Sequence, residues 1–270
     1  MIKIKHSIIS DKQTPALLIL FSLFMIAGCK DKKEEKSADE TNYISYTVQR
    51  SLPHDVKAFT QGFTIHKGQL YESTGQSNSW IGVVDIKTGV AERKVELPAQ
   101  FFGEGITILN NKIFQLTWQS NIGFVYDLTT FEKLKEFTYS NEGWGLTHNN
   151  QQLIMSDGTD KLHFLDTLTL SITKSLNVSY KGKPVTALNE LEYVDGFIYA
   201  NVWQTNLLAK IDATTGNVEG FLDLAPLARQ TGMINPNQDV LNGIAWHKGT
   251  QSLLVTGKYW PLIYVLKIEN

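Results

Sequence analysis

One acidic residue stands at the head of a predicted β-hairpin in this sequence. Glu104 lies between Gly103 and Gly105 in the run FGEGITILNNKIFQLTW, and Trp118 closes that run fourteen residues after Glu104. A carboxylate held in a confined place is suited to general acid–base catalysis, because it can accept a proton and return it. The flanking glycines allow unusual backbone angles and close approach by another group. A glutamate at a strand start is also common as a solvated surface residue, so its neighbours in space decide between the two interpretations.

Glu104 opens one of five similar units. The units begin at residues 61, 104, 144, 189 and 242, at intervals of 43, 40, 45 and 53 residues. Their short runs alternate apolar and polar residues, and pairs such as Asn110-Asn111 and Asp195-Gly196 mark tight turns. In the first four units a further strand ends at an aspartate that a turn follows. Four strands per unit at this period predict an all-β fold, a five-bladed β-propeller.

The fifth unit contains only about three predicted strands before the chain ends at Asn270. Residues 43–50, YISYTVQR, supply the missing outer strand, so that the N-terminal strand closes the last blade. Closure removes the exposed sheet edges that would otherwise pair with other chains. An insertion around residues 225–240 lengthens the last interval.

The repeat predicts two rings of side chains at one end of the central channel. The first ring, at the start of each innermost strand, holds Gln61, Glu104, Trp144, Asn189 and Asn242. The second ring, at the end of the next strand, holds Gly75, Trp118, Gly158, Trp203 and Lys258. Adjacent antiparallel strands bring the start of one beside the end of the other, so both rings belong to one mouth of the channel. The ring positions recur in every unit, but the residue types at these positions differ, which favours a functional site over a structural one.

The segment before residue 43 is not predicted to belong to the propeller. Residues 1–28 have a basic start and an apolar run, PALLILFSLFMIAG, which together predict a signal peptide. The run Ile26-Ala27-Gly28-Cys29 resembles a bacterial lipobox, which implies cleavage before Cys29 and lipidation of its thiol. Residues 29–42 are strongly charged and predict a disordered tether. We therefore expect an extracytoplasmic lipoprotein that is anchored to a membrane through Cys29.

Composition excludes several classes of function. Cys29 is the only cysteine, so residues 43–270, the predicted catalytic domain, have no disulfide, thiolate metal site or cysteine nucleophile. No close ligand spacing relates the histidines His54, His66, His148, His163 and His247. We therefore expect no metal and no cofactor. The formal net charge of −2 gives no reason to expect a nucleic acid partner, and we expect a monomer.

The ring motifs resemble those of the plant-type glutamine cyclotransferases, the glutaminyl-peptide cyclotransferases also found in bacteria. The matching motifs are AFTQGF with LYESTG, FFGEGIT with QLTW, EGWGLT with MSDGT, LNELEYVDGFIYANVWQT, and LNGIAW with VTGKYWP. They cover residues 43–270, and Tyr193 stands where relatives are expected to have tryptophan. The resemblance implies a five-bladed propeller. It also implies conversion of N-terminal glutaminyl residues of peptides and proteins to pyroglutamate, with release of ammonia and without a catalytic metal.

The same resemblance implies a set of site residues. Its catalytic members are Glu104, Lys258 and Asn189. Its substrate-binding members are Phe59, Gln61, Phe102, Trp118, Trp144 and Trp203, to which the first ring adds Asn242. Glu104 is expected to carry a proton from the attacking amine to the leaving nitrogen. The aromatic residues are expected to form an apolar box around the folded substrate, with Lys258 or an amide donor facing the oxyanion.

Two other functions stay open at the level of sequence. A tethered propeller without catalysis could bind peptides or glycans through its aromatic rim, since this fold carries many functions. A metal-dependent lactonase-type hydrolase could use Gln61, Glu104, Asn189 and Asn242 as a ring of oxygen ligands. The acid–ammonium combination of Glu104 and Lys258 argues against the first, and sensitivity to a chelator would favour the second.

Overall fold

The structure is a computed structural model that describes residues 40–76 and 78–269. The predicted signal peptide, the predicted lipidation site at Cys29 and most of the predicted tether lie outside these residues. A compact unit begins at Thr41 and contains the described residues that follow it. Asn42 already belongs to it, because its backbone N–H donates to the Tyr180 hydroxyl at 2.7 Å. Within the described residues, no helix combines the length and hydropathy needed to cross a membrane.

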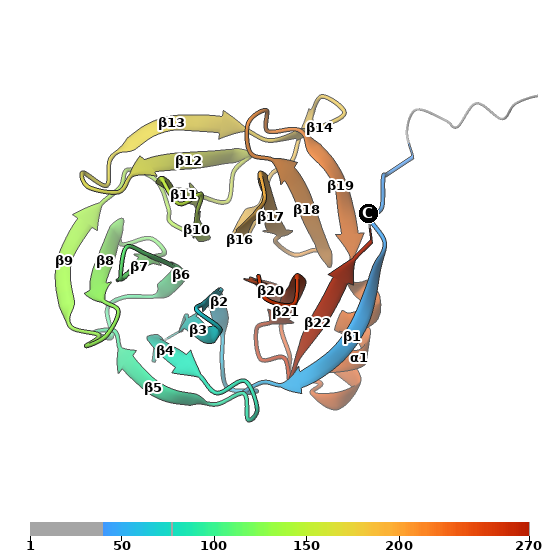
Figure 1. The fold of residues 1–270 in the computed structure, drawn as a ribbon, viewed down its shortest axis with the longest axis horizontal. Helices are drawn as coiled ribbons and strands as arrows, with labels where there is room; N and C mark the ends of the chain where they lie inside the picture. The colour runs from blue at the N-terminus through green and yellow to red at the C-terminus, as the bar shows by residue number, and fades with distance from the viewer. Residues whose placement is uncertain (1–39, 77, 270) are drawn as a thin grey trace, which may run out of the picture. The chain divides into compact units, whose positions relative to one another are not determined.

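Five four-stranded sheets surround a central channel, each with one strand near the axis and one at the rim (Figure 1). Blade 1 contains β2 (Thr60–His66), β3 (Gln69–Thr74), β4 (Trp80–Val84) and β5 (Ala91–Glu96). Blade 2 contains β6 (Gly103–Leu109), β7 (Lys112–Thr117), β8 (Ile122–Asp127) and β9 (Lys133–Thr138). Blade 3 contains β10 (Leu146–His148), β11 (Gln152–Ser156), β12 (Lys161–Asp166) and β13 (Ile172–Asn177). Blade 4 contains β16 (Leu188–Val194), β17 (Phe197–Val202), β18 (Leu207–Asp212) and β19 (Val218–Asp223).

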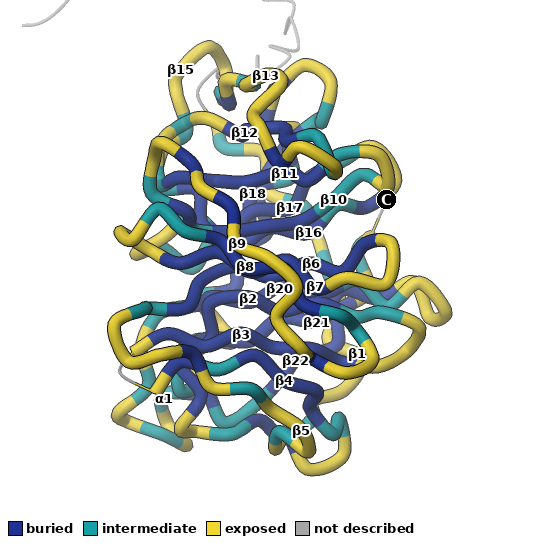
Figure 2. Tube along the Cα trace, turned by 90° about the vertical axis from the view of Figure 1, so that its left-hand side faces the viewer, coloured by how far each residue is buried: buried dark blue, intermediate teal, exposed yellow. Residues whose placement is uncertain are grey.

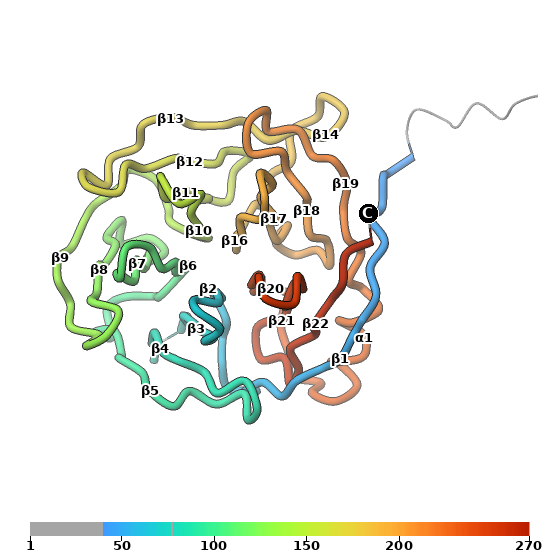
Figure 3. Tube along the Cα trace, in the orientation of Figure 1, coloured from blue at the N-terminus to red at the C-terminus, as the bar shows by residue number. Residues whose placement is uncertain are grey.

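Blade 5 joins the two ends of the compact unit. It contains β20 (Leu241–His247), β21 (Ser252–Gly257), β22 (Leu262–Ile268) and, as its outer strand, β1 (Tyr46–Pro53). The antiparallel register of β1 and β22 places Tyr46 opposite Ile268 and Pro53 opposite Leu262. The predicted five-bladed propeller and its closure by the N-terminal strand are confirmed, although β1 lies three residues further along the chain than predicted. The trace in Figure 3 shows the two ends meeting in this blade.

A buried histidine ties the closing strand to blade 1. His54 follows β1, and its Nε2 lies 3.2 Å from Glu72 Oε1 while its Nδ1 lies 2.8 Å from the Trp260 carbonyl oxygen. Burial lowers the pKa of His54, but the Glu72 carboxylate and the Trp260 carbonyl outweigh it, so this pKa lies above its ordinary value. Thr60, next to the first-ring residue Gln61, donates to the same Glu72 oxygen at 2.7 Å. The closure of the propeller therefore supports the strand that carries Gln61.

Aspartates set the turns between the third and fourth strands, as the sequence predicted. In blades 2, 3 and 4 an aspartate Oδ1 accepts the backbone N–H groups two and three residues further on. These aspartates are Asp127, Asp166 and Asp212. Such side-chain to backbone bonds replace a backbone turn and favour a hairpin at this point.

Glycine lets the innermost strands approach one another closely. A Cβ atom on Gly62 would lie 2.4 Å from the Ile106 nitrogen, and one on Gly145 would lie 2.0 Å from the Asn189 carbonyl oxygen. A side chain at either position would therefore push two blades apart. This contact accounts for the glycine at the second position of the first and third units.

The fourth unit has Glu190 in place of that glycine, and its carboxylate accepts hydrogen bonds from the inner strands of two other blades. Glu190 is fully buried. Its Oε1 accepts the Phe63 N–H of β2 at 3.2 Å and its Oε2 accepts the Ile244 N–H of β20 at 2.7 Å. Burial raises the pKa of Glu190 well above its ordinary value. One side chain of blade 4 thus connects blade 1 with blade 5.

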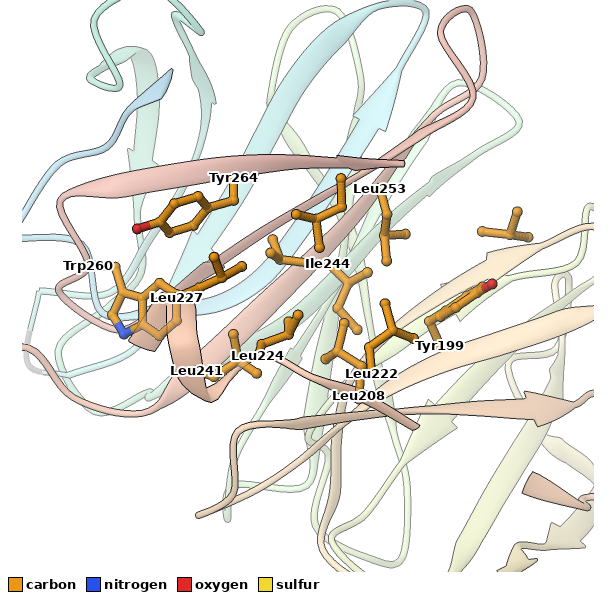
Figure 4. Packing of buried hydrophobic residues seen from close by; sticks show 13 residues of the cluster. Tyr199, Leu208, Leu222, Leu224, Leu227, Leu241, Ile244, Leu253, Trp260 and Tyr264 are labelled. Atoms are coloured by element: carbon orange, nitrogen blue, oxygen red, sulfur yellow. The ribbon is translucent and has the colours of Figure 1, made fainter. Parts of the chain in front are cut away.

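The insertion between blades 4 and 5 forms a helix, which the sequence reading did not predict. Helix α1 (Ala225–Ile234) begins with a proline in its first turn and buries Leu227 and Thr231. Leu227 packs in a core cluster with Trp260 and Tyr264 of blade 5 (Figure 4).

A short hairpin of β14 (Ser179–Tyr180) and β15 (Lys183–Pro184) precedes blade 4. The inner strands of the blades are buried, whereas the turns are exposed (Figure 2).

A second buried carboxylate lies at the turn end of the inner strands. Glu192 lines a cavity of about 670 Å³ together with residues of the inner hairpin turns, among them His66, Asp195 and Lys248. Glu192 Oε1 accepts the Trp246 N–H at 3.0 Å. Burial raises the pKa of Glu192 to about 8. The folded state therefore holds a proton at pH values where an unfolded glutamate has lost it.

We expect the variant Glu192→Gln to lose less stability than the wild type as the pH rises. The pKa of Glu192 is raised from 4.5 to about 8 on folding, so its stabilising proton is fully present below pH 4.5 and is lost as the pH approaches 8. Within that window the difference is at most about 1.4 kcal/mol per pH unit. Urea unfolding of both proteins at several pH values measures it. Parallel stability curves for the two proteins would contradict the assignment.

Candidate active site

β-Bulges aim most of the first ring into the channel mouth. The register of the first two strands shifts at Gln61 in blade 1, at Glu104 in blade 2, at Asn189 in blade 4 and at Asn242 in blade 5. In blade 3, Trp144 lies two residues before β10. A bulge leaves a residue without a cross-strand partner and redirects its side chain, and bulges are common beside active sites.

Backbone hydrogen bonds confirm that the two rings meet at one end of the propeller. Each joins a second-ring N–H to the carbonyl two residues before a first-ring residue. The bonds are Gly75 to Phe59 at 2.9 Å, Trp118 to Phe102 at 3.0 Å, Trp203 to Ala187 at 2.8 Å and Lys258 to Val240 at 3.0 Å. The start of each inner strand in these four blades is therefore fixed to the end of the next strand.

The rings enclose a pocket of about 240 Å³. Its lining residues are Phe59, Gln61, Gln76, Phe102, Glu104, Trp118, Trp144, Asn189, Trp203 and Lys258. The structure thus brings together every residue that the family motifs implied, and it adds Gln76. Among the residues that the structure describes, no three His, Cys, Asp or Glu side chains are grouped so as to hold a metal ion.

Glu104 is the acid of the pocket, and it is only 4% exposed. Gln61 Nε2 donates to Glu104 Oε1 at 2.7 Å, whereas Glu104 Oε2 is buried without a partner. Burial raises the pKa of Glu104 well above its ordinary value, and the Lys258 ammonium opposes that rise only in part. A carboxylic acid with a raised pKa both accepts and donates a proton more readily near neutral pH.

The glycines beside Glu104 serve close packing and not unusual backbone angles. Neither Gly103 nor Gly105 has a positive φ, so that part of the sequence interpretation is wrong. A Cβ on Gly103 would lie 2.5 Å from the Thr74 carbonyl oxygen, and one on Gly105 would lie 2.5 Å from the Leu146 nitrogen. The expected close approach is confirmed, since backbone packs against both sides of Glu104.

Lys258 brings a buried positive charge to the same pocket. Its Nζ lies 4.6 Å from the centroid of the Phe59 ring, a cation–π contact. Burial lowers the pKa of Lys258, while Glu104 and Asp239 oppose that change. The segment after α1 holds the lysine in place, because the Asp239 N–H donates to the Lys258 carbonyl oxygen at 2.9 Å. The unpredicted helical insertion therefore supports a residue of the site.

Aromatic side chains form the walls. Phe102 lies with its ring centroid 6.0 Å from that of Phe59 and 5.6 Å from that of Trp118. Trp144 and Trp203 meet edge to face at 5.4 Å. The two glycines of the second ring make room for these walls. A Cβ on Gly75 would lie 2.3 Å from the Phe102 ring, and one on Gly158 would lie 2.6 Å from the Trp144 ring.

The two ring asparagines occupy different places. Asn189 lines the pocket, and its Oδ1 is buried without a partner. Asn242 is fully buried and does not line the pocket, so the structure does not show the direct substrate contact that its ring position predicted. Its Nδ2 donates to Gln61 Oε1 at 3.1 Å and to the Thr60 carbonyl oxygen at 3.0 Å. Asn242 lies behind Gln61 and orients its carboxamide.

Sequence reasoning missed two residues of this end of the channel. Gln76 directly follows a second-ring residue and lines the pocket. Glu142 accepts hydrogen bonds from two tryptophans of the pocket. The repeat pattern could have indicated Glu142 as a site residue. Glu142 stands two residues before the first-ring residue Trp144, just as Phe102 stands two residues before Glu104.

The fold and the pocket together are typical of a β-propeller enzyme. The buried carboxyl group of Glu104 and the buried ammonium group of Lys258 lie in the same pocket, which aromatic side chains line. Residues 20–268 match the family model described as glutamine cyclotransferase, and the chain belongs to that family. It is 38% identical over 259 residues to the glutaminyl-peptide cyclotransferase of Arabidopsis thaliana, covering 93% of this chain and 80% of that protein. The crystal structure of Myxococcus xanthus glutaminyl cyclase matches with a TM-score of 0.80 and 32% identity, over 85% of this chain and 99% of that one.

Proposed function

We propose that this protein converts N-terminal glutaminyl residues of peptides to pyroglutamate and releases ammonia without a catalytic metal. The observation that best supports this proposal is that two buried acceptor atoms in the pocket have no hydrogen-bond partner. These atoms are Glu104 Oε2 and Asn189 Oδ1. A buried acceptor without a donor is costly, so a ligand that brings donors is favoured. An N-terminal glutamine brings two such groups, its α-amine and its side-chain carboxamide.

The reaction needs one proton to move between two nitrogens of the substrate. The neutral α-amine attacks the side-chain carboxamide carbon, forming a C–N bond and a tetrahedral oxyanion. Glu104, as the carboxylate, takes a proton from the attacking nitrogen and gives it to the departing one. The old C–N bond then breaks and ammonia leaves, so Glu104 returns to its starting state. The raised pKa of Glu104 suits it to both transfers.

The other pocket residues supply charge and confinement. The Lys258 ammonium is the buried positive charge available to the oxyanion, and electrostatic contacts of this type are worth about 2.7–4 kcal/mol when they are well placed. The aromatic walls hold the glutamine side chain folded back toward its own amine and limit access of water. Such positioning replaces part of the entropy cost of ring closure.

Ammonia release from a Gln-Ala dipeptide, measured with and without a strong chelator, tests the proposal. Chelator-resistant release, with a product lighter by one ammonia, is the expected result. Release that the chelator abolishes would assign catalysis to a metal ion. No release by folded protein would favour a propeller that binds peptides or glycans without catalysis.

We expect the variant Lys258→Gln to shift the acidic limb of the kcat profile to higher pH. The Lys258 ammonium lowers the pKa of Glu104, so its removal raises that pKa further. The carboxylate form then appears only at higher pH. The pH dependence of kcat for both proteins measures the shift, and an unmoved acidic limb would contradict the coupling.

We further propose that the protein is an extracytoplasmic lipoprotein anchored through Cys29. The basic start, the apolar run and the lipobox-like residues before Cys29 support this location. Metabolic labelling with a radioactive fatty acid in a bacterial host, with Cys29→Ser as the control, tests it. Label in the wild type alone is expected, and equal labelling of the two proteins would contradict the anchor.

A further inference from the structure

Glu142 collects three side-chain donors at the rim of the pocket. Its Oε2 accepts the indole N–H of Trp118 at 2.7 Å and that of Trp144 at 2.9 Å, and its Oε1 accepts Gln119 Nε2 at 3.1 Å. Trp118 follows β7 of blade 2, and Trp144 precedes β10 of blade 3. One carboxylate therefore joins two walls of the pocket that come from different blades.

The loop that carries Glu142 is itself held in place. It begins at Tyr139, a buried residue whose hydroxyl donates to the Thr117 carbonyl oxygen at 2.6 Å and accepts the Thr117 N–H at 2.9 Å. Asn141 Nδ2 donates to Asp157 Oδ2 of blade 3 at 2.9 Å. A Cβ on Gly143 would lie 2.8 Å from the Tyr139 hydroxyl, so only glycine allows the backbone to pass this close to the Tyr139 side chain. The Glu142 backbone is thus fixed before any ligand binds.

The indoles need such an anchor. Trp118 is 37% exposed, so packing alone leaves part of its ring in solvent. Trp144 in turn packs edge to face against Trp203, which is also 37% exposed. A hydrogen bond to a fixed carboxylate selects one orientation of each indole and reduces the entropy lost when a ligand binds.

The charge of Glu142 fits this role. Burial raises the pKa of Glu142, but the hydrogen bonds from Trp144, Gln119 and Trp118 outweigh it, so this pKa lies below its ordinary value. The side chain is therefore ionised at neutral pH, where it only accepts hydrogen bonds. Glutamine offers one acceptor oxygen in place of two, so it cannot hold all three donors in the same geometry.

We propose that Glu142 is a positioning residue that locks the indoles of Trp118 and Trp144 across two blades and so sets the affinity of the pocket for the glutaminyl side chain. This inference rests on the proposed function. It does not make Glu142 a catalytic residue, because its contacts are to the tryptophans that form the pocket wall.

Steady-state kinetics with a Gln-Ala dipeptide test the role of Glu142 in binding. The variant Glu142→Gln should raise KM roughly 10-fold or more, as expected for losing a hydrogen bond to a charged group, with a smaller change in kcat. The matched control is Glu132→Gln, which removes the same charge from an exposed position in the turn between β8 and β9. A loss confined to kcat, or equal behaviour of the two variants, would overturn the inference.

Indole N–H resonances in ¹H–¹⁵N spectra test the contact without any substrate. They are assigned with the variants Trp118→Phe and Trp144→Phe. Glu142→Gln should move these two resonances and leave in place those of Trp80, Trp246 and Trp260, which do not line the pocket, whereas Glu132→Gln should move none. Unmoved resonances would overturn the inference whatever the activity. If the spectra change as expected but the wild type releases no ammonia, the proposed function fails and the contact stands.

Discussion

Replacing Glu104 by glutamine is expected to lower kcat for ammonia release by roughly 10²–10⁴-fold, the contribution of general acid–base catalysis. The amide oxygen of the new side chain still accepts the hydrogen bond that Gln61 Nε2 donates to Glu104 Oε1. The position of Oε2 then carries an NH2 group that cannot accept from the substrate, so KM should also rise, but by a smaller factor than kcat falls. A loss in kcat that exceeds the change in KM identifies an interaction made chiefly in the transition state. Steady-state kinetics with a Gln-Ala dipeptide measure both constants.

The fold should survive this substitution. Glu104 is buried with a raised pKa, so its ionised form costs stability in the free enzyme, and glutamine removes that cost without changing the shape. Thermal unfolding should therefore give a Tm at or above that of the wild type. A folded Glu104→Gln variant with near wild-type turnover would remove Glu104 from its assigned role.

The repeat explains why so much of the fold was predictable. Each unit carries its own strands and turns, and a residue such as Asp127 or Asn110 acts on its own turn. Contacts within one unit are local, so five similar units specify five similar blades. The closing strand was predictable because blade 5 was one strand short, although its bounds depend on pairing with β22 and lie three residues further along the chain than predicted.

The site was predictable as a set of positions and not as a set of contacts. Alignment of the units places Glu104 and Lys258 at one mouth, because strand ends meet there. It does not show that Asn242 lies behind Gln61, since that depends on how two side chains from different blades share one space. The role of Glu142 depends likewise on indoles from two blades. Helix α1 was missed because its amphipathic pattern is short and only its packing on Trp260 shows its use.

Replacing Glu190 by alanine is expected to be the most destabilising single change in the channel. The Glu190 carboxylate accepts the backbone N–H groups of Phe63 and Ile244, which belong to the inner strands of two other blades. Alanine would leave both groups buried without an acceptor, at about 1–3 kcal/mol each. It would also leave a cavity in place of a fully buried side chain. Urea unfolding at constant pH should show a loss of about 2–6 kcal/mol from the two unpaired groups, to which the cavity adds.

Glu190→Gln separates the hydrogen bonds from the charge. Glutamine fills the same space and keeps one acceptor oxygen, so it should lose clearly less stability than alanine. It also removes a group whose pKa is raised by burial and whose ionisation therefore destabilises the folded state as the pH rises above 4.5. Both variants lack this group, so the gap between them should stay constant with pH, whereas the loss of each relative to the wild type should shrink toward alkaline pH. Equal and substantial losses in the two variants would mean that neither the filled space nor one remaining acceptor replaces the carboxylate. Negligible losses in both would contradict the role of the two accepted N–H groups. In that case the channel would be held by its glycine contacts alone, and Glu190 would be a tolerated exception to them.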